Sequence, residues 1–157
     1  MKELSYMKSN ISDNELNQMI LASRQDSIEK LVVGAVIQIK KKFLLLERVA
    51  NDFLGGLVEL PSGTVDPGEG LLDALEREVK EETGLAIVAV KEFLGSFDYA
   101  SSSGKKTRQF NFLVDTDPGE VKLDPHEHSS YHFVSANEIS SSPLNISENV
   151  KKVLKNI

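Results

Sequence analysis

The sequence contains no cysteine, and this absence limits both its redox chemistry and its metal chemistry. A chain without cysteine can form neither a disulfide framework nor a thiolate metal site. The sequence also lacks any apolar run near the roughly 18 residues that a membrane span requires, and residues 1–18 lack the apolar core of a signal peptide. We therefore expect a cytoplasmic protein that does not associate with membranes.

Basic residues are in deficit as well. The chain has 18 lysines and arginines against 24 aspartates and glutamates, for a net charge of −6. Such a chain is a poor general ligand for DNA or RNA, because the phosphate backbone is bound mainly through lysine and arginine. A small anionic ligand stays compatible with this charge, since a bound divalent metal reverses the local field. The length of 157 residues and the apolar content of 40% are typical of a single globular domain.

The distribution of apolar residues predicts a mixture of strands and helices. Apolar or alternating runs predict strands at residues 31–39, 43–49, 57–60, 85–100, 107–115 and 129–135. Residues 11–30 are expected to form one helix or two short ones, with Ser12 and Glu15 as a capping box. An amphipathic helix is expected at residues 147–157. This order indicates an α/β (α+β) fold, with a sandwich of helices around a mixed sheet.

Acidic residues are concentrated at residues 63–85, which hold seven carboxylates and only two basic residues. A helix is expected to begin near Glu69 and to end at Gly84. At about 100° per residue, Glu78, Glu81 and Glu82 share an arc of about 100° beside the apolar stripe of this helix. Charge count alone favours a solvated helix face. Carboxylates at the edge of a core need a counter-charge, however, and Mg²⁺ or Mn²⁺ would supply it.

The spacing within this stretch resembles the signature of a known family. Its fixed positions are Gly63, Glu69, Arg77, Glu78, Glu81, Glu82 and Gly84. Five residues separate the first two of these positions, and seven separate the second from the third. This pattern is that of the Nudix box, and seven identities match by chance at on the order of one in a billion per start position. The resemblance implies a Nudix hydrolase domain at residues 31–157 and an N-terminal helical extension, residues 1–30, packed on it.

The resemblance also implies a reaction and a set of site residues. Nudix hydrolases cleave a nucleoside diphosphate linked to another moiety, and they use a divalent metal, usually Mg²⁺. The implied metal ligands are Glu78, Glu81, Glu82, the backbone carbonyl of Ser62, and an acid beyond the box, for which Glu127 is the candidate. One of these glutamates is expected to be the general base, and Arg77 is expected to orient them.

Two structural residues of the box have physical roles that we can anticipate. Gly63 is expected to permit a loop conformation that a Cβ would oppose. Glu69 is expected to complement the dipole at the start of the helix.

Candidate substrate contacts lie outside the box. Arg48, Lys106 and Arg108 could bind phosphates, and Phe53 and Tyr99 could stack on a base. The three histidines are interpreted as loop and strand-surface residues rather than as a zinc site, with a substrate contact or a proton shuttle as the alternative. They are His126, His128 and His132.

The leading hypothesis is a Mg²⁺-dependent pyrophosphohydrolase, with Mn²⁺ as the alternative ion. Its substrate would be a normal or oxidised (deoxy)nucleoside triphosphate, cleaved to the monophosphate and pyrophosphate. One alternative is a nucleoside-diphosphate-sugar or dinucleotide pyrophosphatase, in which residues 1–30 could mediate a homodimer. The other is a non-catalytic nucleotide sensor, whose expected mark is a degraded box, whereas the box here is intact.

Overall fold

The computed structural model describes residues 7–52 and 54–157. The strands are β1 (Lys8–Ser9), β2 (Lys30–Ile39), β3 (Lys42–Arg48), β4 (Val58–Glu59), β5 (Ser62–Thr64), β6 (Ile87–Ala100), β7 (Lys106–Thr116) and β8 (His128–Ser135). The helices are α1 (Asp13–Gln25), α2 (Leu71–Thr83) and α3 (Glu148–Leu154), with a short 3₁₀ helix at Ala136–Glu138.

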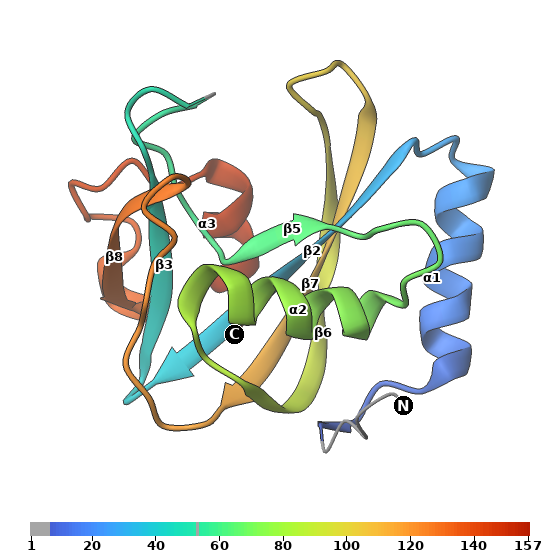
Figure 1. Ribbon diagram of the computed structural model, residues 1–157, viewed down its shortest axis with the longest axis horizontal. Coiled ribbons are helices and arrows are strands. Elements are labelled where there is room, and N and C mark those ends of the chain that lie inside the picture. Colours follow the sequence, from blue (N-terminus) through green and yellow to red (C-terminus); the bar gives the residue numbers. More distant parts are fainter. Residues whose placement is uncertain (1–6, 53) are drawn as a thin grey trace.

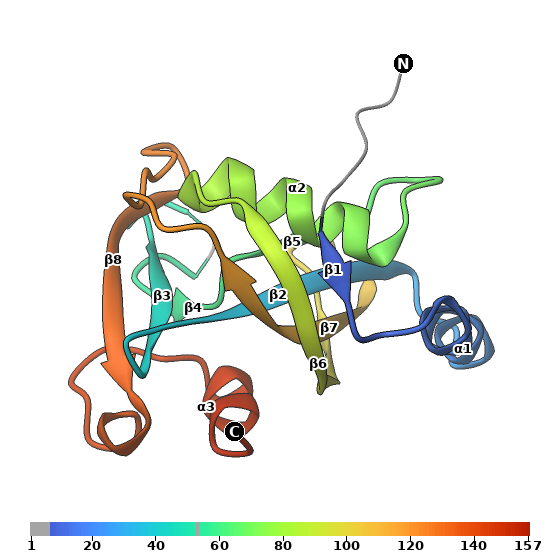
Figure 2. The ribbon, with the colours of Figure 1, turned by 90° about the horizontal axis from the view of Figure 1, so that it is seen from below.

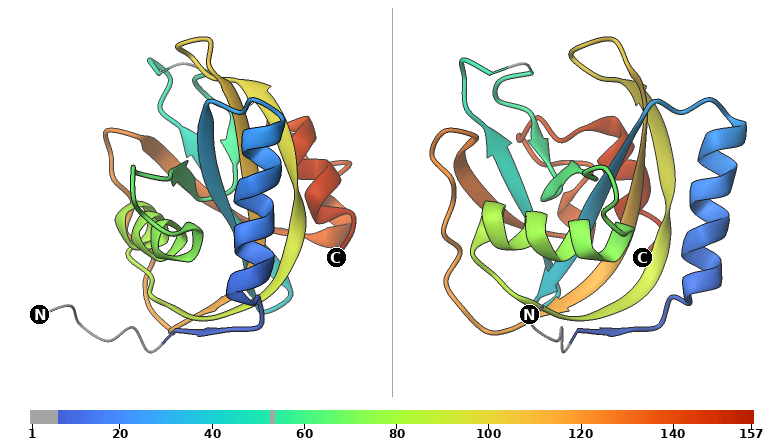
Figure 3. Two further views of the ribbon diagram at one scale, coloured as in Figure 1. Left: turned by 90° about the vertical axis from the view of Figure 1, so that its right-hand side faces the viewer. Right: turned by 45° about the vertical axis from the view of Figure 1, so that its right-hand side comes forward.

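The helices lie on both sides of the strands (Figure 1). Helix α2 covers one face and α3 the other, whereas α1 stands at one edge (Figures 2 and 3). The strands follow the order β1-β6-β7-β2-β3-β4, with β5 paired to β2 and β8 paired to β3. Strands β2 and β7 are parallel, as are β1 and β6, and the other pairs are antiparallel. The expected sandwich around a mixed sheet is therefore confirmed.

Strand β2 is buried on both faces, which explains its almost wholly apolar sequence. Val33, Ala35 and Ile37 belong to the core cluster that includes the apolar face of α2. Val36 points the other way, into the cluster that includes α3. Successive side chains of a strand alternate between its two faces, so both faces of a strand between two helices must be apolar.

Helix α2 has the apolar face that its sequence predicts. Leu71, Leu75 and Val79 are each at most 2% exposed and pack in the same core cluster. Gly70 is the N-cap, and Gly84 ends the helix in the left-handed conformation, at φ 75°. A side chain is disfavoured at that φ, which explains why a glycine stands there.

The N-terminal segment contributes to the same body of structure. Helix α1 is one continuous helix, and the Ser12 side chain accepts a hydrogen bond from the Glu15 N–H at 3.1 Å. Ile11 is 9% exposed and joins the core cluster under α2. The division of the chain at residue 30 stays a prediction. Within the described residues, no helix combines the length and hydropathy of a membrane span.

Candidate functional site

A hollow of about 230 Å³ opens between α2 and the ends of strands β3, β4, β5 and β8, and we call it the acidic pocket. Six of its lining residues are carboxylates, and the others include the cation Arg48 and the imidazole of His128. The six carboxylates are Asp52, Glu59, Asp66, Glu78, Glu82 and Glu127. So many like charges around one small hollow require a counter-charge from a ligand or from protonation.

Glu82 lies at the buried end of this pocket. It is 3% exposed, and its Oε1 accepts a hydrogen bond from the Ser62 backbone N–H at 3.0 Å. The pKa of Glu82 is raised to about 9, mainly by burial and also by the charges of Glu78 and Glu127, while the Ser62 N–H opposes the rise. The ionised form is therefore unfavourable until a cation balances it.

Glu78 lies one turn earlier on α2, against the backbone of Gly63. A Cβ built on Gly63 would stand 2.0 Å from Cδ of Glu78, so only glycine leaves room for the carboxylate. Gly63 belongs to β5 and is not among the described residues with positive φ. The expectation of a special loop conformation at Gly63 is therefore wrong, and the glycine serves close approach instead. Burial raises the pKa of Glu78, although the hydrogen bond and charge of Arg77 oppose that rise.

Arg77 links the start of α2 to the pocket. Its Nε and Nη2 donate to the two carboxylate oxygens of Glu69, both at 2.8 Å, and Nη2 also donates to the Thr64 carbonyl at 2.9 Å. Its Nη1 donates to Glu78 at 2.7 Å. Hydrogen bonds from Arg77 lower the pKa of Glu69 to about 2. Glu69 precedes the N-cap Gly70 and holds Arg77, a contact that the expected helix-dipole role did not include.

The structure separates Glu81 from the other box glutamates. The Glu81 side chain is 58% exposed, and its Oε2 lies 3.3 Å from Nη1 of Arg77. It is not among the residues that line the acidic pocket, whereas Ser62, Glu78, Glu82 and Glu127 are. The role of Glu81 as a metal ligand stays a prediction.

Among the lining residues that the sequence did not single out are Glu59 and His128. His128 is 5% exposed, so its interpretation as a surface histidine is wrong. Its Nε2 lies 3.5 Å from Oε1 of Glu59, and its Nδ1 lies 3.6 Å from Oε2 of Glu82. His126 is exposed, and His132 is half-buried with Nε2 3.1 Å from Glu47. The sequence carries no signal for this burial, because His128 begins β8 while Glu127 lies in the turn before it.

Arg48 and Tyr99 line a second hollow beside the acidic pocket, with a volume of about 360 Å³. We call it the aromatic hollow, because Phe97 and Tyr99 stand in its wall with ring centroids 6.0 Å apart. Arg48 lines both hollows, and its Nε donates to Oε1 of Glu59 at 2.9 Å. The remaining aromatic candidate, Phe53, lies outside the described residues.

The other two basic candidates lie at the start of β7, away from the acidic pocket. Arg108 pairs with Asp98 at 2.8 Å and with Asp26 at 2.9 Å. Lys106 donates from Nζ to the Asp26 carbonyl at 2.8 Å. Neither residue lines the acidic pocket or the aromatic hollow. These contacts tie β7 to the end of α1, and phosphate binding by Lys106 and Arg108 stays a prediction.

The donor set of the acidic pocket fits a hard divalent cation. Its carboxylates supply the oxygen ligands that such ions prefer. One donor atom from each of Glu82, Glu127 and His128 lies within 4.8 Å of the others. Burial raises the pKa of Glu82, so a cation beside this carboxylate would favour its ionised form.

Comparison with known proteins supports the same class. Residues 29–157 match the NUDIX domain model. An ADP-ribose pyrophosphatase from Methanocaldococcus jannaschii is 38% identical over 96 residues, which cover 59% of this chain and 54% of that protein. A CTP pyrophosphohydrolase from Escherichia coli is 34% identical over 113 residues, covering 72% of this chain and 81% of that protein. The structure of a MutT protein from Methanosarcina mazei Go1 has a TM-score of 0.72 and 30% identity, over 81% of this chain and 91% of that one.

The matched model covers most of the chain, which therefore belongs to the Nudix family. It is a member of the Nudix hydrolases, and its relatives include pyrophosphatases. This chain spans about half the length of the ADP-ribose pyrophosphatase that it matches. Nudix hydrolases generally use a divalent metal, and the acidic pocket offers a cluster of ligands for one.

Proposed function

We propose that the protein hydrolyses a normal or oxidised (deoxy)nucleoside triphosphate to the monophosphate and pyrophosphate, with Mg²⁺ as its metal. The observation that supports this most is the adjacency of the two hollows, which share Arg48, Asp52, Glu59 and Ser62 in their walls. A triphosphate with its metal suits the acidic pocket, and a base suits the aromatic hollow. The proposal includes a cytoplasmic location.

The residues of the acidic pocket would divide the work of the reaction. Glu78, Glu82 and Glu127 would hold the metal, which when bound offsets the negative charge that builds on the phosphate under attack by water. Arg77 keeps the Glu78 carboxylate in place through its 2.7 Å hydrogen bond. Glu127 is exposed at the mouth of the pocket and is the best-placed carboxylate to accept the proton of the attacking water. Arg48 would contact a phosphate that spans the two hollows.

The comparison with the Escherichia coli protein favours a triphosphate, because that match covers 81% of a CTP pyrophosphohydrolase. A second candidate is supported by the 38% identity to an ADP-ribose pyrophosphatase. That candidate is a pyrophosphatase of a nucleoside-diphosphate sugar or a dinucleotide. It includes a homodimer formed through residues 1–30.

An assay that separates the nucleotide products by chromatography tests the proposal. The panel contains nucleoside triphosphates, their oxidised forms, ADP-ribose and dinucleotides, each with and without Mg²⁺. We expect the highest kcat/KM for a triphosphate, and a loss of activity in Glu82→Gln with the fold intact. Preference for ADP-ribose or a dinucleotide would support the second candidate instead. Activity on no member of the panel would favour the nucleotide sensor.

A further inference from the structure

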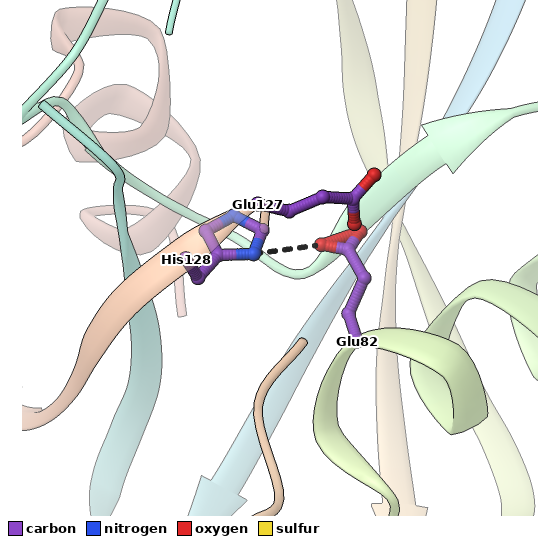
Figure 4. A group of neighbouring side chains, drawn as sticks. All are labelled: Glu82, Glu127 and His128. Atoms are coloured by element: carbon purple, nitrogen blue, oxygen red, sulfur yellow. Dashed lines mark ion pairs between the residues drawn. The ribbon is translucent and has the colours of Figure 1, made fainter. Parts of the chain in front are cut away.

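The imidazole of His128 has an unexplained atom. Its Nδ1 is buried and, among residues 7–52 and 54–157, has no hydrogen-bond partner. Buried polar atoms without a partner are uncommon in folded proteins and call for a specific explanation. Nδ1 faces Oε2 of Glu82 across 3.6 Å, which is too long for a hydrogen bond (Figure 4).

The surroundings of this nitrogen suit a shared ion. Glu82, Glu127 and His128 each offer one donor atom, and the three atoms lie within 4.8 Å of one another. Figure 4 shows the two carboxylates turned toward each other, with the imidazole beside that of Glu82. Two ligands of one ion, each about 2.1 Å from it, stand roughly 3.0–3.4 Å apart. The separation of 3.6 Å between Nδ1 and Oε2 is close to this spacing.

The other ring nitrogen also faces a carboxylate, at a distance that is likewise too long for a hydrogen bond. Nε2 of His128 lies 3.5 Å from Oε1 of Glu59, and this oxygen also accepts the 2.9 Å hydrogen bond of Arg48. Metal-binding histidines commonly direct their second ring N–H to a carboxylate, which selects the tautomer. With its proton on Nε2, the ring presents the lone pair of Nδ1 to Glu82 and Glu127.

We propose that Nδ1 of His128 is a ligand of a divalent cation held together with Glu82 and Glu127, and that this nitrogen strengthens the binding of Mn²⁺ more than that of Mg²⁺. The inference rests on the proposed function, since it concerns the cation of the same pocket. Mg²⁺ prefers oxygen ligands, whereas an imidazole nitrogen suits the transition metals better. The competing arrangement is an imidazolium that bridges Glu59 and Glu82 and binds no ion.

Electron spin-echo envelope modulation of the Mn²⁺-loaded chain tests this directly, because it detects nitrogen bound to the ion. The chain has three histidines, so variants of an untagged protein assign the signal. We expect ¹⁴N modulation in the wild type and in the double variant His126→Gln/His132→Gln, and none in His128→Gln. The Mn²⁺ dissociation constant should rise roughly 10-fold in His128→Gln, and the Mg²⁺ constant should rise less.

The orienting contact has its own test. Glu59→Ala should weaken Mn²⁺ binding roughly 10-fold, and Glu59→Gln, which keeps an acceptor for the Nε2 proton, should restore it.

The results that overturn the inference are distinct from those that overturn the function. Absence of ¹⁴N modulation in the wild type, or its loss in the His126→Gln/His132→Gln variant, shows that His128 does not bind the ion. Neither result depends on whether His128→Gln folds. If the ¹⁴N modulation is absent or is lost in this way, but hydrolysis still depends on the metal, the inference fails and the proposed function stands. If Mn²⁺ does not bind and no substrate is hydrolysed, the proposed function fails as well.

Discussion

Replacing Gly63 with alanine would place a methyl group where the Glu78 carboxylate lies. The new Cβ would stand 2.0 Å from Cδ of Glu78, and 2.2 and 2.4 Å from its two oxygens. Non-bonded carbon atoms approach to roughly 3.5 Å, so the carboxylate must withdraw by about 1.5 Å. That movement also breaks the 2.7 Å hydrogen bond from Arg77 to Glu78.

The effects of Gly63→Ala on activity and on stability should differ in size. Since Glu78 is a proposed metal ligand, its displacement by more than 1 Å should lower kcat/KM about 100-fold. Stability should fall only slightly, because the clash involves the end of a flexible side chain and Arg77 keeps both hydrogen bonds to Glu69. Loss of one such hydrogen bond, worth about 1 kcal/mol at this partly exposed site, corresponds to a Tm decrease of about 3 °C.

Steady-state kinetics on the preferred substrate, together with thermal unfolding, measure both effects. Gly119→Ala is the matched control, since its Cβ would meet only Cδ2 of Leu85, at an ordinary contact distance of 3.5 Å. That variant should behave as the wild type. A Gly63→Ala protein with wild-type kcat/KM would refute the reasoning, and so would one whose activity falls only because it unfolds.

Three further predictions concern single side chains. The pKa of Glu82 is raised from 4.5 to about 9, so its stabilising contribution to the metal-free protein is fully present below pH 4.5 and is lost as the pH rises toward 9. Tm measured in the presence of a chelator should fall between pH 4.5 and pH 9. A fall of equal size in Glu82→Gln would show that Glu82 is not the group responsible. Arg77→Lys should lower kcat/KM roughly 10-fold in steady-state assays, because one ammonium cannot replace the forked contact with Glu69. An unchanged kcat/KM would show that this forked contact does not support catalysis. Tyr99→Ala should raise KM roughly 10-fold with little change in kcat, if its ring stacks on the base. Tyr131→Ala, on the exposed side of β8, is the control. An equal rise in KM in that variant would show that the effect of Tyr99→Ala is not due to base stacking.

The long elements could be predicted from the sequence because their patterns are periodic. Helix α2 repeats its apolar positions at helical spacing, and β2 is apolar on both faces. The short strands have no such pattern. Strands β1 and β5 were not expected, because β1 exists only through pairing with β6, and β5 only through pairing with β2.

Only the part of the site that lies on helix α2 could be predicted from the sequence. The positions of Glu78 and Glu82 beside the apolar stripe follow from helix geometry, and both line the acidic pocket. Glu59 and His128 come from two other strands, and no local pattern brings them to α2. The requirement for glycine at position 63 has no sequence signal of this kind either, because it depends on how closely β5 approaches Glu78 in the folded chain.

The carboxylates that we propose as metal ligands differ in how freely they can move. Glu82 is enclosed and tied to the Ser62 N–H, so its position is fixed by the fold. Glu127 is held through its backbone, whose carbonyl accepts from the Val49 N–H and whose N–H donates to the Asp124 carbonyl, both at 3.1 Å, and its side chain is exposed. Exposed side chains change rotamer in picoseconds to nanoseconds, whereas enzymes typically turn over in milliseconds or longer. On the proposed mechanism, Glu127 would have time within one turnover to alternate many times between holding the metal and receiving a proton, while Glu82 stays in place.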